Sequence, residues 1–375
     1  MKRTICITDT QLYSINGGGQ VVVKSLVEIL SKNYNIIYIG DRENLLNLKK
    51  YTAIKPLKTF FYKLKINKMH ILSKGIEKLC FKIPALTKPI IKKIALDCDV
   101  IISNSITDYL TLKRNNNLRY KGVIIIKHHP YYKFNEKYPD FIIKNKNYII
   151  FALNYEDFNL VKKRYNDNVK ILKLGIITNK NDKIYPPKDF NFYKNKSIIF
   201  SIGRLSEKQK RFSLSIEAFS IIANKYKNLI YAIAGTGPDM KRYIKLAKKL
   251  GIQKRVKFLG FISNEEKNWF LKNSKIVLQT SEKENQSIVL IEALSKGTIV
   301  LSTKNASSNF LIKDNLNGFL ASYKKEDIAQ SLEKILNLDK SILHKISNNA
   351  IKSVKDFTMT NFRRELSEAI NKILD

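Results

Sequence analysis

Short apolar runs alternate with amphipathic stretches along the first half of the chain. Residues 3–8 (RTICIT) and 35–40 (NIIYIG) predict buried strands, and residues 21–31 (VVVKSLVEILS) between them predict a helix preceded by a glycine loop. Strand, glycine loop, helix and strand form a βαβ opening, which predicts a parallel sheet. Further strands are expected at residues 100–103, 123–127, 148–152 and 170–174, and a helix at residues 157–165.

The second half shows the same architecture without repeating the sequence. Its apolar runs predict strands at residues 197–202, 229–234, 256–259, 275–280 and 298–302. Helices are expected at residues 212–225, 239–250 and 264–273, before Gly297, and at residues 325–336, 341–357 and 360–374. These elements predict a second doubly wound α/β sheet.

A length of 375 residues is too great for one ordinary core, so two domains are expected. We expect an N-terminal domain of residues 1–178 and a C-terminal domain of residues 197–357. The polar stretch 179–196, with Pro186 and Pro187, is expected to be a linker. A final helix, residues 358–375, is expected to pack back on the N-terminal domain. Two such halves predict a cleft that holds the ligand.

Composition indicates a folded globular protein, with 44% hydrophobic residues. Cys6, Cys80 and Cys98 have no metal-ligand spacing, and we expect buried reduced thiols. The basic N-terminus lacks the apolar region of a secretory signal, and no apolar run is long enough to span a bilayer. A cytoplasmic protein is expected.

The charge is strongly basic, with 68 Lys and Arg against 32 Asp and Glu and a net charge of +36. Part of it reflects a composition rich in Lys, Asn and Ile. Residues 49–93, however, hold many lysines, several aromatic and aliphatic residues and the single acid Glu77, in stretches that prolines break into short helical pieces. This pattern favours an anionic membrane surface. The alternatives are a solvated basic face and a nucleic-acid groove.

Two carboxylates, Glu284 and Glu292, bracket a predicted strand–loop–helix turn. In open α/β sheets such turns, at the carboxyl ends of strands, hold ligands. The helix after the turn, which Ser287 is expected to cap, presents unpaired N–H groups to a phosphate. Glu292 lies in the apolar run IVLIEAL, where a carboxylate needs a partner. A buried salt bridge and a ribose diol are the two alternatives for that partner.

A basic turn follows the first strand of the second half, with Arg204 after Gly203 and then Lys208, Lys210 and Arg211. Arg204 as a planar fork and Lys210 as a point charge could bind the two phosphates of a nucleoside diphosphate. The alternative is a surface turn in a lysine-rich protein.

These pieces resemble the family-4 retaining glycosyltransferases, which have the GT-B fold. The matching segments are Gly203-Arg204-Leu205, residues 234–238 (AGTGP), 258–261 (FLGF), Glu284-x7-Glu292 and Asn317-Gly318, in the family's order. The first half matches more loosely, through residues 17–19 and His128. The resemblance implies an α/β fold of two doubly wound Rossmann-like domains that face each other across a cleft.

The resemblance also implies roles for individual residues. Arg204 and Lys210 would bind the donor diphosphate, with Gly18 and Gly19 approaching it from the first domain. Glu292 would bind the ribose. The other implied contacts are Glu284 and His128 at the transferred sugar, the backbone of Gln286, Ser287 and Ile288 around sugar and phosphate, and Phe261 and Ile262 beside the base.

The chain departs from the family pattern at three places. Asn285 and Gln286 follow the first Glu, where the family most often has glycine and an aromatic residue. Lys210 fits the family lysine only with one inserted residue, so Lys208 is its rival. His128 is followed by His129, so either histidine could face the cleft.

The resemblance implies a metal-independent transferase with no cofactor and a nucleotide-sugar donor, UDP favoured. The chain has no Asp-x-Asp motif, and its histidines form no metal-ligand spacing apart from the adjacent pair. The expected acceptor is a saccharide or lipid-linked saccharide of bacterial surface polysaccharide synthesis, reached from a membrane surface through residues 49–93. A GT-B sugar-nucleotide epimerase and a basic nucleic-acid-binding protein are the alternatives, and nucleic acid is not the expected partner.

Overall fold

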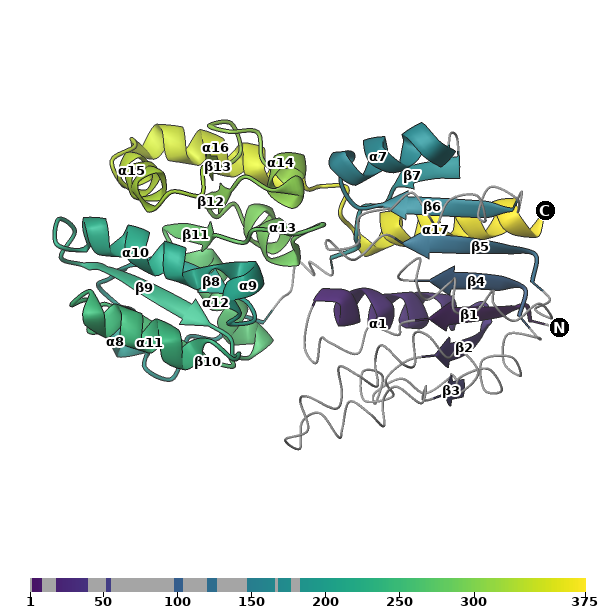
Figure 1. The fold of residues 1–375 in the computed structure, drawn as a ribbon, viewed down its shortest axis with the longest axis horizontal. Coiled ribbons are helices and arrows are strands. Elements are labelled where there is room, and N and C mark those ends of the chain that lie inside the picture. The colour runs from purple at the N-terminus through teal and green to yellow at the C-terminus, as the bar shows by residue number, and fades with distance from the viewer. Residues whose placement is uncertain are drawn as a thin grey trace. The chain divides into compact units, whose positions relative to one another are not determined.

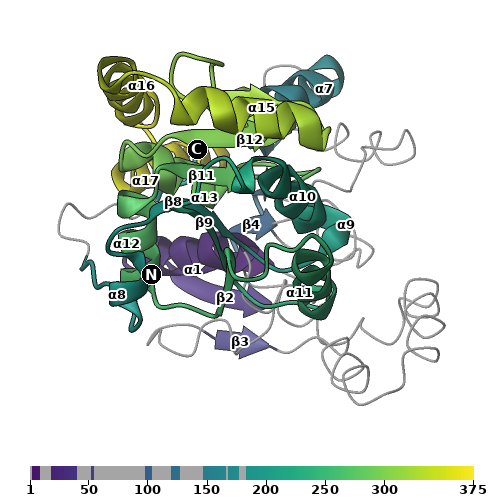
Figure 2. The same cartoon turned by 90° about the vertical axis from the view of Figure 1, so that its left-hand side faces the viewer.

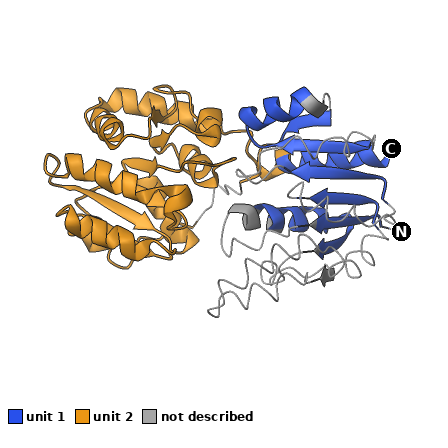
Figure 3. Cartoon of the chain, in the orientation of Figure 1, with its two compact units in different colours: residues 1–172, 362–375 blue, residues 173–361 orange. Residues whose placement is uncertain are grey.

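The computed structural model describes residues 2–8, 18–39, 52–54, 98–103, 120–126, 147–165, 168–176 and 183–375. The chain divides into two compact units (Figure 3). Unit 1 comprises residues 1–172 and 362–375, and unit 2 comprises residues 173–361. The helix that closes the chain, α17 (Met359–Leu374), therefore begins in unit 2 and ends in unit 1.

Unit 1 contains a parallel sheet in the order β3-β2-β1-β4-β5-β6-β7 (Figure 1). Its strands are β1 (Thr4–Thr8), β2 (Asn35–Ile39), β3 (Thr52–Ile54), β4 (Val100–Ser103), β5 (Gly122–Ile126), β6 (Tyr148–Ala152) and β7 (Val169–Ile171). Its described helices besides α17 are α1 (Gly18–Leu30) and α7 (Tyr155–Tyr165). The chain winds outward from β1 in both directions, which confirms the doubly wound prediction for this half.

Two local predictions for unit 1 need correction. Helix α1 begins at Gly18, so Gly18 and Gly19 form its first turn instead of a loop before it. Residues 52–54 form the edge strand β3, where the basic segment was expected to be helical. The rest of residues 49–93 lies outside the described residues.

The end of the chain belongs to unit 1. Lys121 Nζ donates a hydrogen bond to the carbonyl oxygen of Leu374, at 3.1 Å, and Ile373 lies against Gly122 at the start of β5. The final turn of α17 is thus fixed to the sheet. Cys6 and Cys98 are buried thiols of the same unit and form no disulfide, and Cys80 lies outside the described residues.

Unit 2 contains a second parallel sheet, in the order β10-β9-β8-β11-β12-β13. Its strands are β8 (Ser197–Ile202), β9 (Leu229–Ala234), β10 (Val256–Gly260), β11 (Ile276–Gln279), β12 (Val300–Thr303) and β13 (Phe319–Ala321). Its helices are α8 (Phe190–Tyr193), α9 (Glu207–Lys210), α10 (Phe212–Ala223), α11 (Met240–Lys249), α12 (Asn264–Asn273), α13 (Ile288–Ser295), α14 (Ala306–Leu311), α15 (Lys325–Leu336) and α16 (Lys340–Ser353). The second doubly wound sheet is therefore also confirmed.

Successive strand residues of unit 2 pack into different hydrophobic clusters. Ile198 and Phe200 of β8 join a cluster that includes Leu294 of α13, whereas Ile199 joins one that includes Phe219 of α10. Because side chains alternate across a strand, a run such as SIIFSI is buried on both faces. This explains why the strands of the unit are continuous apolar runs with helices on both sides.

Residues 183–196 belong to unit 2, whereas the sequence predicted a linker over residues 179–196. Within them, α8 places Tyr193 in the core, 3% exposed and in edge contact with Trp269 and Phe270. The prolines break the local periodicity, but aromatic contacts with distant residues still hold the segment on the domain.

Candidate active site

The candidate site lies at the point where the sheet of unit 2 changes direction. β8 pairs with β9 on one side and with β11 on the other. The chain runs outward from β8 through β9 to β10 and then returns to β11. Open parallel sheets hold ligands at such a switch point, outside the carboxyl ends of the strands. The segments that follow β8 and β11 there carry Lys210 and Glu284.

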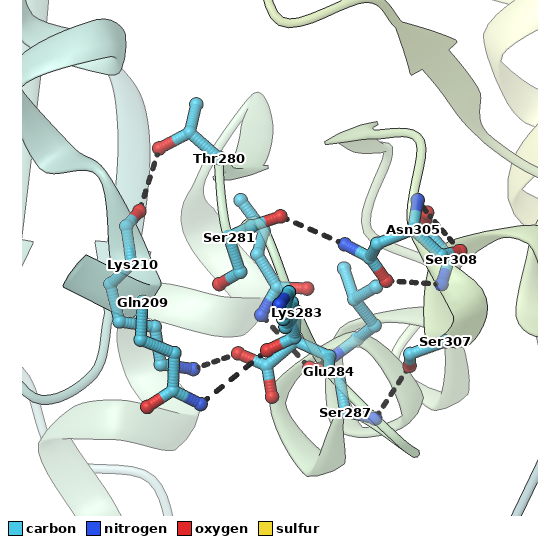
Figure 4. A network of polar contacts seen from close by, with 12 residues as sticks. Gln209, Lys210, Thr280, Ser281, Lys283, Glu284, Ser287, Asn305, Ser307 and Ser308 are labelled. Atoms are coloured by element: carbon cyan, nitrogen blue, oxygen red, sulfur yellow. Dashed lines mark hydrogen bonds and ion pairs between the residues drawn. The ribbon is translucent and has the colours of Figure 1, made fainter. Parts of the chain in front are cut away.

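Lys210 and Glu284 form an ion pair across this switch point (Figure 4). Lys210 Nζ lies 2.5 Å from Glu284 Oε1, and the side chains are only 16% and 13% exposed. A Cβ added at Gly203 would lie 3.3 Å from Lys210 Cε, so the glycine leaves room for the lysine stem. Screening by water is weak at this depth, and the two charges therefore interact more strongly than a surface pair.

Hydrogen bonds hold the two segments together independently of that ion pair. The Thr280 hydroxyl lies 3.1 Å and 3.0 Å from the carbonyl oxygens of Lys210 and Arg211. The backbone N–H of Glu282 donates to the Gln209 carbonyl at 2.9 Å, and Arg211 Nη2 lies 2.8 Å from Glu282 Oε2. Lys210 and Glu284 are thus positioned before a ligand arrives, which lowers the cost of organising charges around it.

Ser287 caps α13, as the sequence predicted: its Oγ accepts from the N–H of Leu290 at 3.4 Å. Its own N–H, expected to help cradle sugar and phosphate, donates to Ser307 Oγ at 2.7 Å (Figure 4). The Gln286 side chain accepts from the N–H of Leu174 at 2.7 Å. The serine N–H and the glutamine oxygen are therefore already engaged in hydrogen bonds within the protein.

Glu292 has a partner on one oxygen and none on the other among the described residues. Its Oε1 lies 2.6 Å from Lys267 Nζ of α12, with the side chains 15% and 19% exposed. Its Oε2 is buried without a hydrogen-bond partner. A carboxylate oxygen in that state accepts hydrogen bonds from a ligand hydroxyl at little extra desolvation cost. The salt bridge and the ribose contact considered from the sequence are therefore compatible.

The predicted base-flanking residues follow β10. Phe261 is 78% exposed and Ile262 is half-buried. The Gly260 carbonyl accepts from the N–H of Gly235 at 2.6 Å, so the ends of β10 and β9 adjoin. Gly235 has a φ of +119°, and a Cβ there would lie 1.9 Å from the Gly203 oxygen. Only glycine allows this loop to approach the turn that carries Arg204.

The structure gives fewer contacts for the remaining predicted residues. Arg204 is exposed directly after Gly203. Lys208 is also exposed and lines a separate groove with Glu217 and Arg242, whereas Lys210 contacts Glu284. His128 and the rival His129 lie outside the described residues. Among the described ranges, no three His, Cys, Asp or Glu side chains cluster as metal ligands would.

Sequence reasoning missed Lys267, Thr280 and Ser307, which position Glu292, Lys210 and Ser287. Lys267 precedes Glu292 by 25 positions, on a different helix. Its only sequence signal is that a carboxylate in an apolar run needs a cation. Many lysines in this chain could serve as that cation, so the sequence does not select one.

Comparison with known proteins agrees with this geometry. Residues 185–353 match the family model "Glycosyl transferases group 1". The alpha-1,3/1,6-mannosyltransferase ALG2 of Dictyostelium discoideum is 26% identical over 250 residues, 62% of this chain and 56% of that protein. An uncharacterized glycosyltransferase of Haemophilus influenzae is 23% identical over 332 residues, 86% and 87% of the two chains. This chain spans only 47% to 58% of the length of three of the curated relatives.

The solved structure of Anabaena HepE in complex with UDP and glucose superposes with a TM-score of 0.74 and 16% identity, over 98% of this chain and 99% of that one. The fold is thus GT-B, the class that the two doubly wound sheets define. The match to the glycosyl transferases group 1 family model lies within unit 2 and covers most of it. These matches favour neither the epimerase nor the nucleic-acid-binding alternative.

Proposed function

We propose that this protein transfers a sugar from a nucleoside-diphosphate sugar to a saccharide or lipid-linked saccharide. The observation that carries the proposal is the Lys210–Glu284 pair at the switch point of the unit 2 sheet. A cation and a carboxylate held side by side suit a donor with an anionic leaving group and a neutral sugar. The cation faces the diphosphate and the carboxylate faces the sugar.

The departing diphosphate gains negative charge as the bond to the sugar breaks. Lys210 and Arg204 bind that charge more strongly in the transition state than in the bound donor, and this difference accelerates transfer. We propose that these cations and the N-terminus of α13 supply this stabilisation without a metal ion. Transfer that persists after chelation with EDTA supports this point, and transfer that requires added Mg²⁺ or Mn²⁺ contradicts it.

Glu292 is proposed to bind the ribose. The proposal is supported by its Oε2, which has no hydrogen-bond partner among the described residues, while Lys267 holds Oε1. Phe261, exposed beside Gly260, is proposed to flank the base. A UDP-sugar is the favoured donor, because Anabaena HepE was solved with UDP and glucose. The name of a human relative gives GDP-Man instead, so the base requires a direct test.

The stereochemistry and the acceptor are further parts of the proposal. We propose retention by transfer on the front face, in which a leaving phosphate oxygen takes the proton of the acceptor hydroxyl. Relatives named for lipopolysaccharide core and amylovoran biosynthesis support a surface polysaccharide as the product. Residues 49–93, mostly outside the described residues, are proposed to contact the anionic inner face of the cell membrane. None of the described helices is both long and apolar enough to span a bilayer.

Thermal unfolding of the purified protein with UDP, GDP, ADP and CMP tests the donor class. A ligand at 100 times its dissociation constant adds about 2.7 kcal/mol of stability, or several degrees. We expect a selective rise with UDP that UDP-sugars share and that Lys210→Ala reduces. Absence of a rise with every nucleotide contradicts the proposed donor site.

A further inference from the structure

Helix α11 of unit 2 presents a strongly basic face. Every exposed position of the helix is Lys or Arg except Ile244: the exposed basic residues are Lys241, Arg242, Lys245, Lys248 and Lys249. From residue 240 to residue 264 the chain contains no acid. Among the described residues, no acid forms an ion pair with Lys241, Lys245, Lys248 or Lys249. The charge of these four lysines is therefore not paired within the helix or by its described neighbours, whereas Arg242 lines a groove with Glu207 and Glu217.

The opposite face holds the helix rigidly on the domain. Tyr243 and Ala247 are buried, and Met240, Leu246 and Leu250 pack against the same hydrophobic cluster. Because these anchors fix the rotation of the helix, the lysines cannot turn towards partners within the unit. The basic face is a fixed surface of unit 2.

The helix dipole accounts for only part of this charge. Lys248 and Lys249 lie in the last turn, where cations are stabilised by the dipole. Lys241 and Arg242 lie in the first turn, where the same dipole disfavours cations; Asp239 precedes them at the N-cap, and Glu207 and Glu217 line a groove with Arg242. Lys241 and Lys245 lie outside the last turn and gain no such stabilisation, so their charge is available to an external anion.

The arrangement around Ile244 points to the kind of partner. Ile244 is 45% exposed, and Lys241 and Lys248, three residues before it and four after it, share its side of the helix. An apolar side chain ringed by cations fits a bilayer, where lysines meet phosphate headgroups and the apolar residue enters the acyl boundary. A single-stranded nucleic acid would favour an exposed aromatic residue for stacking, but the one aromatic of α11, Tyr243, is fully buried.

We propose that the exposed face of α11 is a docking surface for an anionic lipid bilayer, formed by Lys241, Ile244, Lys245 and Lys248. It is distinct from residues 49–93 and lies outside the donor site, so its test does not depend on glycosyl transfer. The surface would hold unit 2, the proposed donor-binding unit, at the membrane by contacts of its own.

The test is co-sedimentation with phosphatidylcholine vesicles, with and without phosphatidylglycerol, at low salt. The variant is Lys241→Gln, Lys245→Gln and Lys248→Gln combined, which keeps helix propensity close to that of lysine. Its matched control is Lys340→Gln, Lys345→Gln and Lys352→Gln on α16, all exposed and equal in charge change. Helix α16 lies at the other end of unit 2 from α11 (Figures 1 and 2).

Each basic residue at an anionic surface contributes about 1 kcal/mol, or about fivefold, so we expect the α11 variant to partition up to about 100-fold less into phosphatidylglycerol vesicles. We expect the α16 variant to partition like the wild type, and Ile244→Ser to lose several-fold without any change in charge. Unchanged thermal unfolding and unchanged stabilisation by UDP exclude a folding defect in each variant.

Three outcomes overturn the proposal. One is equal losses in the α11 and α16 variants, which indicate a response to net charge alone. Another is the absence of any difference between the α11 variant and the wild type, whether both partition into the vesicles or neither does. The third is loss of binding to a DNA duplex in the α11 variant together with no effect of Ile244→Ser on vesicles, which assigns the face to nucleic acid.

Discussion

Lys210 Nζ lies 2.5 Å from Glu284 Oε1, although the two residues are 74 positions apart in the chain. The pair places opposite charges at the carboxyl ends of β8 and β11, within one hydrogen-bonded network. A donor diphosphate that binds Lys210 would compete with Glu284 for the ammonium group. The carboxylate would then be available to a sugar hydroxyl, so the ion pair of the free protein prepares both contacts.

Replacing Glu284 tests the sugar contact. We expect Glu284→Gln to lower kcat by about 100- to 1,000-fold, because one stabilising group is lost at the reacting centre. The dissociation constant for UDP should not rise, because UDP lacks the sugar and the neutral amide competes less with its diphosphate for Lys210. Steady-state transfer and calorimetric titration measure the two quantities. Glu282→Gln, which changes the neighbouring acid paired with Arg211, is the control, and unchanged turnover of Glu284→Gln rules out the assigned role.

Replacing Arg204 tests the diphosphate contact. Arg204→Ala should weaken UDP binding and lower kcat/KM together by about 10- to 100-fold, since a charged hydrogen bond contributes about 1.5–3 kcal/mol. Lys208→Ala removes an exposed cation from the same turn and should leave both values near those of the wild type. If Lys208→Ala weakens UDP binding and Lys210→Ala does not, Lys208 is the lysine that binds the diphosphate.

The Lys267–Glu292 pair predicts that loss of the lysine destabilises the protein and that a second substitution, at Glu292, restores most of the stability. Lys267→Met leaves a mostly buried carboxylate without its cation and should lower the free energy of unfolding by about 1–3 kcal/mol. Adding Glu292→Gln removes that unpaired charge and should restore most of the loss. Urea unfolding of both single variants and the double variant measures the coupling. Losses that simply add would show that the pair does not act as a unit.

Substitutions at two glycines with positive φ distinguish the free-energy cost of backbone strain from the cost of a steric contact. Gly251→Ala has open space around its Cβ and should cost about 1–2 kcal/mol from the left-handed conformation alone. Gly235→Ala should cost more, because its Cβ would also meet the backbone oxygen of Gly203. Thermal and urea unfolding rank the two variants. Equal losses would mean that the loop relaxes away from the contact.

The contact between Lys173 and Asp356 predicts a pH dependence of stability. A hydrogen bond from Lys173, with the charge of the same ammonium group, lowers the pKa of Asp356. The stabilisation is therefore present above the ordinary pKa of aspartate and is lost as the pH falls through the lowered value. Asp356→Asn should be slightly less stable than the wild type at pH 7, with the gap closing in acid. Half-exposure of the pair keeps the effect small, and a gap that widens in acid contradicts the sign.

The sequence by itself determined the two doubly wound sheets and the charged residues around the second one. Runs such as SIIFSI and LIYAIA are buried on both faces, so their apolar pattern is continuous and visible locally. Short elements such as α8, α9 and β13 escaped prediction, because a few residues do not establish a period. The cap at Ser287 was found because a cap depends on residues within one turn.

Only the tertiary structure decided which charges meet. The sheet order places the ends of β8 and β11 side by side, and with them Lys210 and Glu284. Likewise, the packing of α12 near α13 selected Lys267 as the partner of Glu292 from a chain rich in lysine. Coulomb attraction depends on distance in space and not on separation along the chain. A local pattern therefore identifies candidate charges, whereas strand order and helix packing determine their partners.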